Sequence, residues 1–210
     1  MKIAFMGTQC NGKSTLIKEF CKRWPMYKEV KSTYRKLIKT GKITNNEDGT
    51  AESQRAILDA IIDDTQKASA EGNEFLVFDR CVIDNIVYSL WLNEKGKVSD
   101  EFIMDTKRIA FEAIRVFDII FYVPLREEIN IVPKKGRAID PVYRQEIDNL
   151  FRAVVGTYEK QQGIFFPKED CPAVITLEGP PDLRIEQIPL YIKPSGKFFD
   201  EEDGSLLAGM

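Results

Sequence analysis

Apolar and polar positions follow two patterns along this chain. Short apolar runs with little or no internal periodicity are typical of strands buried in a parallel sheet, and they recur here. Longer stretches carry apolar residues three or four positions apart, which predicts amphipathic helices. The predicted strands are 2–6 (KIAFM), 27–30, 74–80 (EFLVFDR), 118–124 (DIIFYVP) and 172–179 (PAVITLEG), and the predicted helices are 13–24, 32–39, 51–70, 82–92, 100–116, 140–162 and 183–191.

Residues that begin or end helices stand at several of these boundaries. Pro25 ends the first helix, because proline has no N–H and clashes with the preceding turn. Gly41 stops the second, and Thr50 is placed to cap the long helix that starts at residue 51. Pro141 suits the first turn of the helix over 140–162.

Strands that alternate with helices predict an α/β protein with a mostly parallel sheet and helices on both faces. Ligands of such folds bind beyond the carboxyl ends of the strands. Gly7, Asp79 and the segment after Pro124 all stand at such ends. We expect one domain over residues 1–192, followed by a loose tail over 193–210, which is polar and contains glycine.

Composition narrows the function classes. The chain has 210 residues and a net charge of −3, which suits one globular domain and argues against a dedicated duplex-DNA binder, although a local basic groove stays open. It has no apolar run of membrane-spanning length and no signal peptide, so a cytoplasmic protein without membrane contact is expected. It contains no histidine, so a general base would be Asp or Glu, or less often Lys or Tyr.

The stretch GTQCNGKST at residues 7–15 matches G-x-x-x-x-G-K-[ST], the phosphate-binding loop. It lies between a predicted strand and a predicted helix, and this placement makes a chance match in a turn the weaker interpretation. Lys13 is expected to reach the β- and γ-phosphates of a nucleoside triphosphate, and Ser14 to hold Mg²⁺. The predicted nucleotide-binding residues of the loop are Gly7, Asn11, Gly12, Lys13, Ser14 and Thr15.

A second candidate group begins at the end of the third strand. Asp79 is placed to serve Mg²⁺ or to accept a proton, and Arg80 to bind a phosphate or a substrate hydroxyl. A salt bridge at the end of the strand is the alternative. Asp84 and Tyr88 follow Arg80 at helical spacing and are expected to line an acceptor pocket. A solvated helix face with a core tyrosine competes with that interpretation.

A basic, glycine-containing stretch over about 125–145 suits a lid that closes over the triphosphate. Arg137 is its expected catalytic residue, with Arg144 and Lys135 as further phosphate ligands. A solvated charge run is the alternative. Arg35, after the second strand, is a candidate ligand for an acidic acceptor. The alternative, that Arg35 has no part in function, is equally well supported.

Three segments, GTQCNGKST, FDRCVIDNIVY and GRAIDPVYRQEID, in this order and spacing resemble the P-loop kinases of nucleosides and nucleotides. The resemblance covers about residues 1–190 and is strongest to the branch of nicotinamide riboside kinase-like proteins, which carry a DR-x-x-x-D-x-x-x-Y stretch. Deoxynucleoside and thymidylate kinases share the acid–Arg pair. The resemblance implies the three-layer P-loop NTPase fold with a lid, a role for Asp79 in Mg²⁺ binding or catalysis, and acceptor binding by Arg80.

One position departs from the family pattern. Relatives often have an acidic residue after the second strand, and this chain has Ser32 there. Either Asp79 then takes the role of the acid as well, or Glu29 substitutes, or the acceptor is already phosphorylated. A phosphorylated acceptor needs no strong base, and Lys31 and Arg35 favour an anion.

The sequence therefore predicts a Mg²⁺-dependent kinase that moves the γ-phosphoryl group of ATP to a nucleoside, a nucleotide or a related hydroxyl. ATP is favoured over GTP because no N-K-x-D motif is evident. One alternative acceptor is DNA, at a 5′ end or a hydroxymethylated pyrimidine, because residues 27–39 are basic and hold two tyrosines suited to stacking bases. Another alternative is an NTPase that switches or assembles partners. A homodimer is left open.

Overall fold

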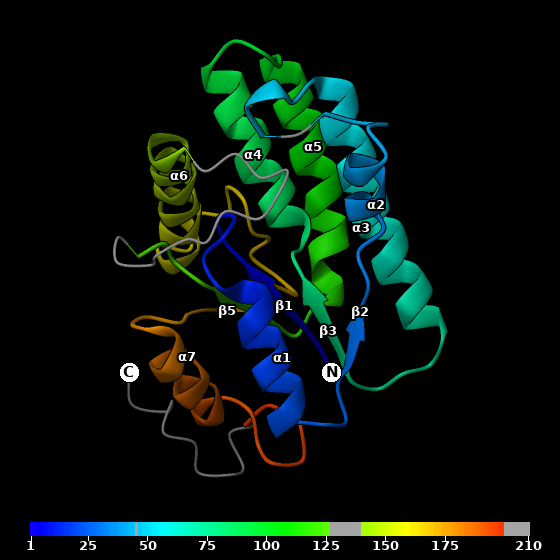
Figure 1. Cartoon of the computed structure of the whole chain (residues 1–210), viewed down its shortest axis with the longest axis vertical. Coiled ribbons are helices and arrows are strands. Elements are labelled where there is room, and N and C mark those ends of the chain that lie inside the picture. The colour runs from blue at the N-terminus through cyan, green and yellow to red at the C-terminus, as the bar shows by residue number, and fades with distance from the viewer. Residues whose placement is uncertain (45, 127–139, 200–210) are drawn as a thin grey trace.

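The protein, described here by a computed structural model, is built on one parallel sheet. The structure describes residues 1–44, 46–126 and 140–199. Within these ranges the strand order is β2-β3-β1-β4-β5, with β1 in the middle (Figure 1). The strands are β1 (Lys2–Met6), β2 (Lys28–Val30), β3 (Leu76–Asp79), β4 (Ile119–Tyr122) and β5 (Ala173–Thr176).

Helices follow the strands as the hydrophobic pattern predicts, with ends that differ by a few residues. The predicted α/β fold with a parallel sheet and helices on both faces is confirmed. The segment 42–50 holds a 3-10 turn over Asn46–Asp48. The helices are α1 (Lys13–Arg23), α2 (Tyr34–Lys39), α3 (Ala51–Ala70), α4 (Val82–Glu94), α5 (Asp100–Ala113), α6 (Pro141–Glu159) and α7 (Pro181–Gln187).

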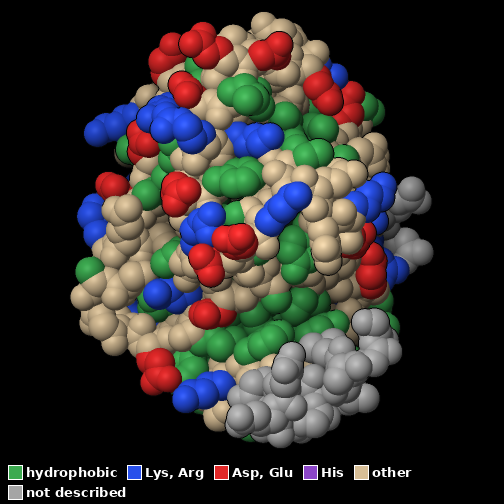
Figure 2. Space-filling model, turned by 180° about the vertical axis from the view of Figure 1, so that it is seen from behind, with side chains coloured by type: hydrophobic (Ala, Val, Ile, Leu, Met, Phe, Trp, Pro, Cys, Tyr) green, Lys and Arg blue, Asp and Glu red, His purple; other side chains and the backbone are tan. Residues whose placement is uncertain are grey.

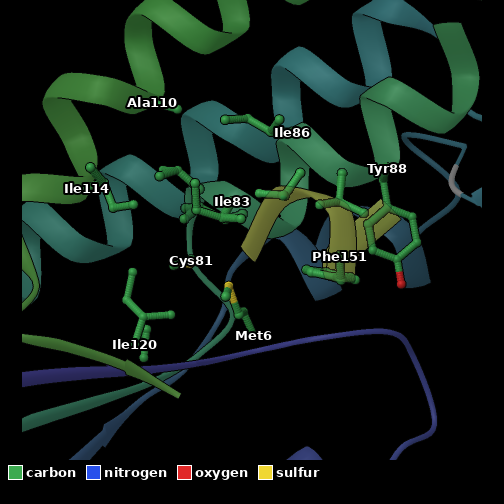
Figure 3. Packing of buried hydrophobic residues seen from close by; sticks show 14 of the residues in the cluster. Met6, Cys81, Ile83, Ile86, Tyr88, Ala110, Ile114, Ile120 and Phe151 are labelled. Atoms are coloured by element: carbon green, nitrogen blue, oxygen red, sulfur yellow. The ribbon is translucent and has the colours of Figure 1, made fainter. Parts of the chain in front are cut away.

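Alternating residues of the central strand feed two separate cores, because successive side chains of a strand point to opposite faces. Ala4 and Met6 join the larger core under α3, α4, α5 and α6, which Figure 3 shows from close by. Ile3 and Phe5 join the smaller core with α1 and the C-terminal segment. The sheet is therefore the middle layer of three.

The helix caps follow the sequence signals. Thr50 accepts a hydrogen bond from the N–H of Ser53 and so caps α3. Asp140 caps α6 by accepting from the N–H of Val142 at 2.7 Å, and Pro141 is the first residue of that helix. These caps satisfy N–H groups that a helix leaves unpaired at its start.

The register of the sheet determines what lies near the phosphate loop. Phe5 of β1 pairs with Asp79 of β3, and Met6 pairs with Tyr122 of β4. The loop that follows β1 is therefore flanked by the ends of β3 and β4. Parallel strands bring three segments that are far apart in sequence to one edge of the sheet.

The expected loose tail starts too early. Residues 193–199, its described part, pack on the domain instead of lying free. The indole N–H of Trp24 donates to the carbonyl of Lys193 at 2.9 Å, and the hydroxyl of Tyr27 donates to that of Gly196 at 2.6 Å. Buried aromatic side chains with polar groups need such partners, and backbone carbonyls supply them here. None of the described helices is both long enough and apolar enough to span a membrane.

Candidate active site at the phosphate loop

Gly7 opens the phosphate loop in a conformation that only glycine adopts easily. Its φ is +140°, and a Cβ atom there would lie 2.4 Å from the carbonyl oxygen of Val123 and 2.9 Å from Nδ2 of Asn11. Gly12 closes the loop at φ +90°, directly before α1. Both glycines of the motif are therefore required by backbone geometry.

Lys13 lies inside the loop. Its ammonium group donates to the carbonyls of Gly7 at 2.7 Å and Thr8 at 2.5 Å, and to Oδ1 of Asn11 at 3.0 Å. Burial, together with the nearby charge of Arg80, lowers the pKa of Lys13 to about 7. A charge held in so little water interacts strongly with any phosphate that enters.

Ser14 and Asp79 meet next to Lys13. The Ser14 hydroxyl donates to Oδ2 of Asp79 at 2.7 Å, and Arg35 makes an ion pair with the same oxygen. The other oxygen, Oδ1, is buried without a hydrogen-bond partner among the described residues. Burial raises the pKa of Asp79, but the charges of Lys13 and Arg35 outweigh burial and hold it below its usual value.

This donor set fits a magnesium ion. Mg²⁺ is usually bound through one or two carboxylates and the phosphates of a nucleotide, with water completing its shell. The unpartnered Oδ1 of Asp79 and the hydroxyl of Ser14 provide the protein side of such a shell. Among the described residues no three acidic or cysteine side chains gather into a group that could hold a metal ion.

Arg80 has an unusual backbone and an aromatic setting. Its φ is +96°, which is strained for a residue with a side chain. The guanidinium lies 4.9 Å from the ring centre of Tyr88 and 5.8 Å from that of Tyr34, and it donates a long hydrogen bond of 3.5 Å to the Tyr88 hydroxyl. A small pocket between β2, β3 and α3 is lined by Ser32, Asp79 and Arg80.

Arg80 lies before the start of α4, so only Asp84 and Tyr88 belong to this helix, and the face that they share turns toward the phosphate loop. Asp84 is 1% exposed and accepts from the N–H of Gly7 at 3.3 Å and of Cys81 at 3.0 Å. The Tyr88 hydroxyl accepts from the N–H of Gln9 at 3.2 Å, and Figure 3 shows that hydroxyl pointing away from the apolar cluster. Each oxygen of Asp84 accepts from a backbone N–H group, which shows a structural role, and its part in an acceptor pocket stays a prediction.

Arg144 lies at the loop, but it holds the backbone. Its guanidinium, on α6, donates to the carbonyls of Gln9 and Cys10, each at 3.2 Å. Arg184 of α7 does the same for Asn11 at 3.3 Å and also donates to Pro124 at 2.7 Å. The sequence analysis missed Arg184. The available signal was its position four residues before Ile188, on the buried face of the last predicted helix.

Two tyrosines expected to stack nucleic-acid bases are core residues. Tyr27 is 4% exposed in the smaller core, and Tyr34 is 5% exposed in the larger one. Their rings are therefore not accessible for stacking. Arg137 and Lys135 of the expected lid lie outside the described residues.

A protein-family comparison fits this geometry. Residues 2–162 match the family model AAA_28, described as an AAA domain. The chain belongs to this AAA domain family. The comparison with curated proteins finds no match for this AAA-family chain.

Solved structures with the same fold include a deoxyadenosine kinase, a thymidylate kinase and the NadR protein. Deoxyadenosine kinase from M. mycoides has a TM-score of 0.60 and 22% identity, over 90% of this AAA-family chain and 96% of its own. Thymidylate kinase from Candida albicans has a TM-score of 0.54 and 16% identity, over 89% of this chain and 88% of its own. NadR in complex with NR has a TM-score of 0.63 and 16% identity, over 95% of this chain and 52% of its own. The resemblance to nucleoside and nucleotide kinases is confirmed.

Proposed function

We propose that this protein is a kinase that transfers the γ-phosphoryl group of ATP to a nucleoside, a nucleotide or a related hydroxyl compound. The observation that carries the proposal is the hydrogen bond of 2.7 Å between Ser14 of the phosphate loop and Asp79, whose carboxylate also pairs with Arg35. A phosphate loop alone supports any NTPase. Here the carboxylate of Asp79 joins the phosphate loop to Arg35 of α2, the helix that follows β2. This arrangement supports a donor site beside an acceptor site.

Each residue has a defined task on the donor side. Lys13 neutralises charge on the β- and γ-phosphates, and its buried position makes this charge effective. Bound Mg²⁺ would be held by Ser14 and Asp79 and would offset charge on the transferring group. Arg144 and the glycines keep the loop in shape. The chemistry is then mainly positioning and charge neutralisation.

On the acceptor side, Arg35 and Arg80 present two positive charges near Asp79. Since the pKa of Asp79 is held low, its carboxylate is a weak base, which orients a hydroxyl better than it deprotonates one. Ser32 stands where an acid is common in relatives, and its hydroxyl lies 3.5 Å from the carbonyl of Asp79. Both observations support an acceptor whose hydroxyl loses its proton late in the transfer, or an acceptor that already carries a phosphate.

Glu29 is a poor substitute for that acid. It pairs in register with Val77, whose side chain joins the smaller core on the α1 face of the sheet. Neighbouring Val30 lines the small pocket on the other face. Side chains alternate along a strand, so Glu29 points away from the pocket, toward Cys21 of α1. Burial raises the pKa of the Cys21 thiol, and the charge of Glu29 is the second cause of this increase.

The lid role of Arg137 is part of the proposal. Positive charge supplied during transfer lowers the barrier more than it strengthens ATP binding. Arg137→Ala is therefore expected to lower kcat by more than it raises the dissociation constant for ATP. An unchanged kcat would remove Arg137 from the mechanism.

DNA is the weaker acceptor. Within 27–39 the tyrosines are buried, Lys28 pairs with Glu71 at 2.7 Å, and Arg35 pairs with Asp79. Figure 2 shows basic and acidic side chains mixed over one face of the molecule. A groove that tracks a single strand stacks bases on accessible aromatic rings, and the rings of this segment are buried.

The deciding experiment measures transfer from γ-labelled ATP with Mg²⁺ to a panel of acceptors. The panel contains nucleosides, nucleoside monophosphates, nicotinamide riboside, and single- and double-stranded DNA with ordinary and hydroxymethylated bases. Label on a small molecule that disappears with Lys13→Ala supports the proposal. Label found only on DNA would mean that DNA, and not a small molecule, is the acceptor. Phosphate release with no labelled acceptor supports an NTPase switch instead.

A further inference from the structure

Side-chain cations bind every backbone carbonyl of the phosphate loop from residue 7 to residue 11. Lys13 takes the first two, Arg144 the next two and Arg184 the last. In a trans peptide the carbonyl of one residue and the N–H of the next point in opposite directions. Whatever fixes a carbonyl therefore also fixes the direction of the following N–H.

The first half of the loop shows this rule. The carbonyl of Thr8 accepts from Lys13, and the N–H of Gln9 donates to Tyr88 on the other side. This peptide therefore presents its carbonyl to the lysine and its N–H to α4. Its N–H is occupied within the protein.

In the second half of the loop, arginines of α6 and α7 bind the carbonyls in place of Lys13. Arg184 of α7 holds the carbonyl of Asn11, so the N–H of Gly12 points away from α7. Arg144 of α6 holds the carbonyl of Cys10, so the N–H of Asn11 points away from that arginine. Neither N–H has an acceptor among the described residues. Successive N–H groups that point the same way form an anion-binding concavity.

We propose that Arg184 is a positioning residue of the nucleotide site, holding the peptide between Asn11 and Gly12 so that its N–H faces the triphosphate. The inference rests on the proposed function, because it requires a bound polyphosphate. The guanidinium suits this task because its separate nitrogens bridge two segments, the loop at Asn11 and the exit of β4 at Pro124. An ammonium on a flexible stem can also bind two carbonyls, but the rigid planar guanidinium fixes the direction of each hydrogen bond more closely.

Stability alone does not account for this arginine. It is 1% exposed, both described partners are neutral carbonyls, and its Nε has no hydrogen-bond partner among the described residues. Burial lowers its pKa, and Glu178 and Asp148 favour its charge only from a distance, since no described carboxylate forms an ion pair with it. An apolar side chain of similar volume is often at least as stable as a charge buried in this way. A cost of this kind is typical of a group retained for a site.

The test compares Arg184→Met and Arg184→Lys with the wild-type chain and with Arg23→Met. Arg23 is the matched control, because it is a half-exposed arginine that pairs with Glu186 of α7 at 2.9 Å. Titration calorimetry with Mg²⁺ measures affinity for two probes, AMP-PNP and inorganic tripolyphosphate. It is run at a temperature where thermal melts show each variant folded.

Both affinities are expected to fall about tenfold or more in Arg184→Met and less in Arg184→Lys, with Arg23→Met unchanged, since hydrogen bonds to charged groups contribute on that scale. If the methionine variant does not fold, the lysine variant decides. A lower melting temperature with unchanged affinities overturns the inference, as does an effect on AMP-PNP alone, which indicates a base contact. A wild-type chain that binds neither probe overturns the proposed function and this inference together.

Discussion

The hydroxyl of Ser14 donates a hydrogen bond of 2.7 Å to the carboxylate of Asp79, a residue 65 positions further along the chain. Ser14 belongs to the first turn of α1, and Asp79 is the last residue of β3. The pairing of β1 with β3 brings them together. The proposed donor and acceptor sides of the site therefore share one buried carboxylate.

Asp79→Asn is expected to lower kcat about 100-fold while the fold stays intact, because the amide keeps the shape of the side chain but weakens metal support and the pair with Arg35. Steady-state transfer and thermal melts measure the two effects. Asp64→Asn is the control, since Asp64 lines the same small pocket but accepts from Thr33. A loss of stability with normal kcat would make Asp79 a structural residue only.

Binding of a triphosphate is expected to take up about one proton at pH 8. The pKa of Lys13 is lowered from 10.5 to about 7, mainly by burial, so the Lys13 side chain is largely neutral at pH 8 when no ligand is bound, and a polyphosphate restores its charge. Affinity should fall about tenfold per pH unit above 7. Calorimetry in buffers of different ionisation enthalpy measures the uptake, and Lys13→Met should remove it.

The same lowered pKa has a consequence for stability with the opposite sign. Between pH 7 and 10.5 the unfolded chain binds more protons at Lys13 than the folded one, so the free energy of unfolding should rise with pH across this window. Urea titrations of wild type and Lys13→Met at pH 7 and pH 9 measure it. An equal change in both proteins would show that Lys13 is not responsible.

Gly7→Ala is expected to destabilise the protein by about 3 kcal/mol, because the methyl group would lie 2.4 Å from the carbonyl oxygen of Val123. Gly72→Ala is the comparison, since Gly72 also has positive φ but open space around it, and should cost about 1 kcal/mol. Urea unfolding gives both values. Similar costs would mean that backbone strain and not the clash explains the glycine.

Asp84→Asn is expected to destabilise the protein by about 3 kcal/mol, because one of its two backbone N–H partners, on Gly7 or Cys81, would face the amide NH₂. Denaturant unfolding and acceptor KM are measured together. Unchanged stability with a raised acceptor KM would support the predicted role in an acceptor pocket instead.

The elements of the fold were readable from sequence because their signals are local. Apolar runs, the cap at Thr50, Pro141 in the first turn of α6 and the glycine loop all depend on residues a few positions apart. Strand order depends on pairings between β1 and residues more than 70 positions away, and periodicity does not specify them. The parallel α/β class followed from the alternation of elements alone.

The candidate site was predictable where a motif encodes it. Lys13 and Ser14 come from the phosphate-loop pattern, and Asp79 from its place at a strand end. Spacing put Asp84 on the same helix face as Arg80 but did not reveal that this face meets the loop. The contact between Arg184 and Asn11 spans 173 residues, so no local pattern contains it.

The packing of the C-terminal segment on α1 has a consequence for biosynthesis. Trp24 and Tyr27 find their hydrogen-bond partners at residues 193 and 196, and the loop finds Arg184. The helix that begins at Lys13 is made well before these partners, since 169 residues separate Trp24 from Lys193. A ribosome-bound chain that ends before residue 184 lacks groups that shape the loop, so the proposed ability to hold a nucleotide should arise only after that residue has been made.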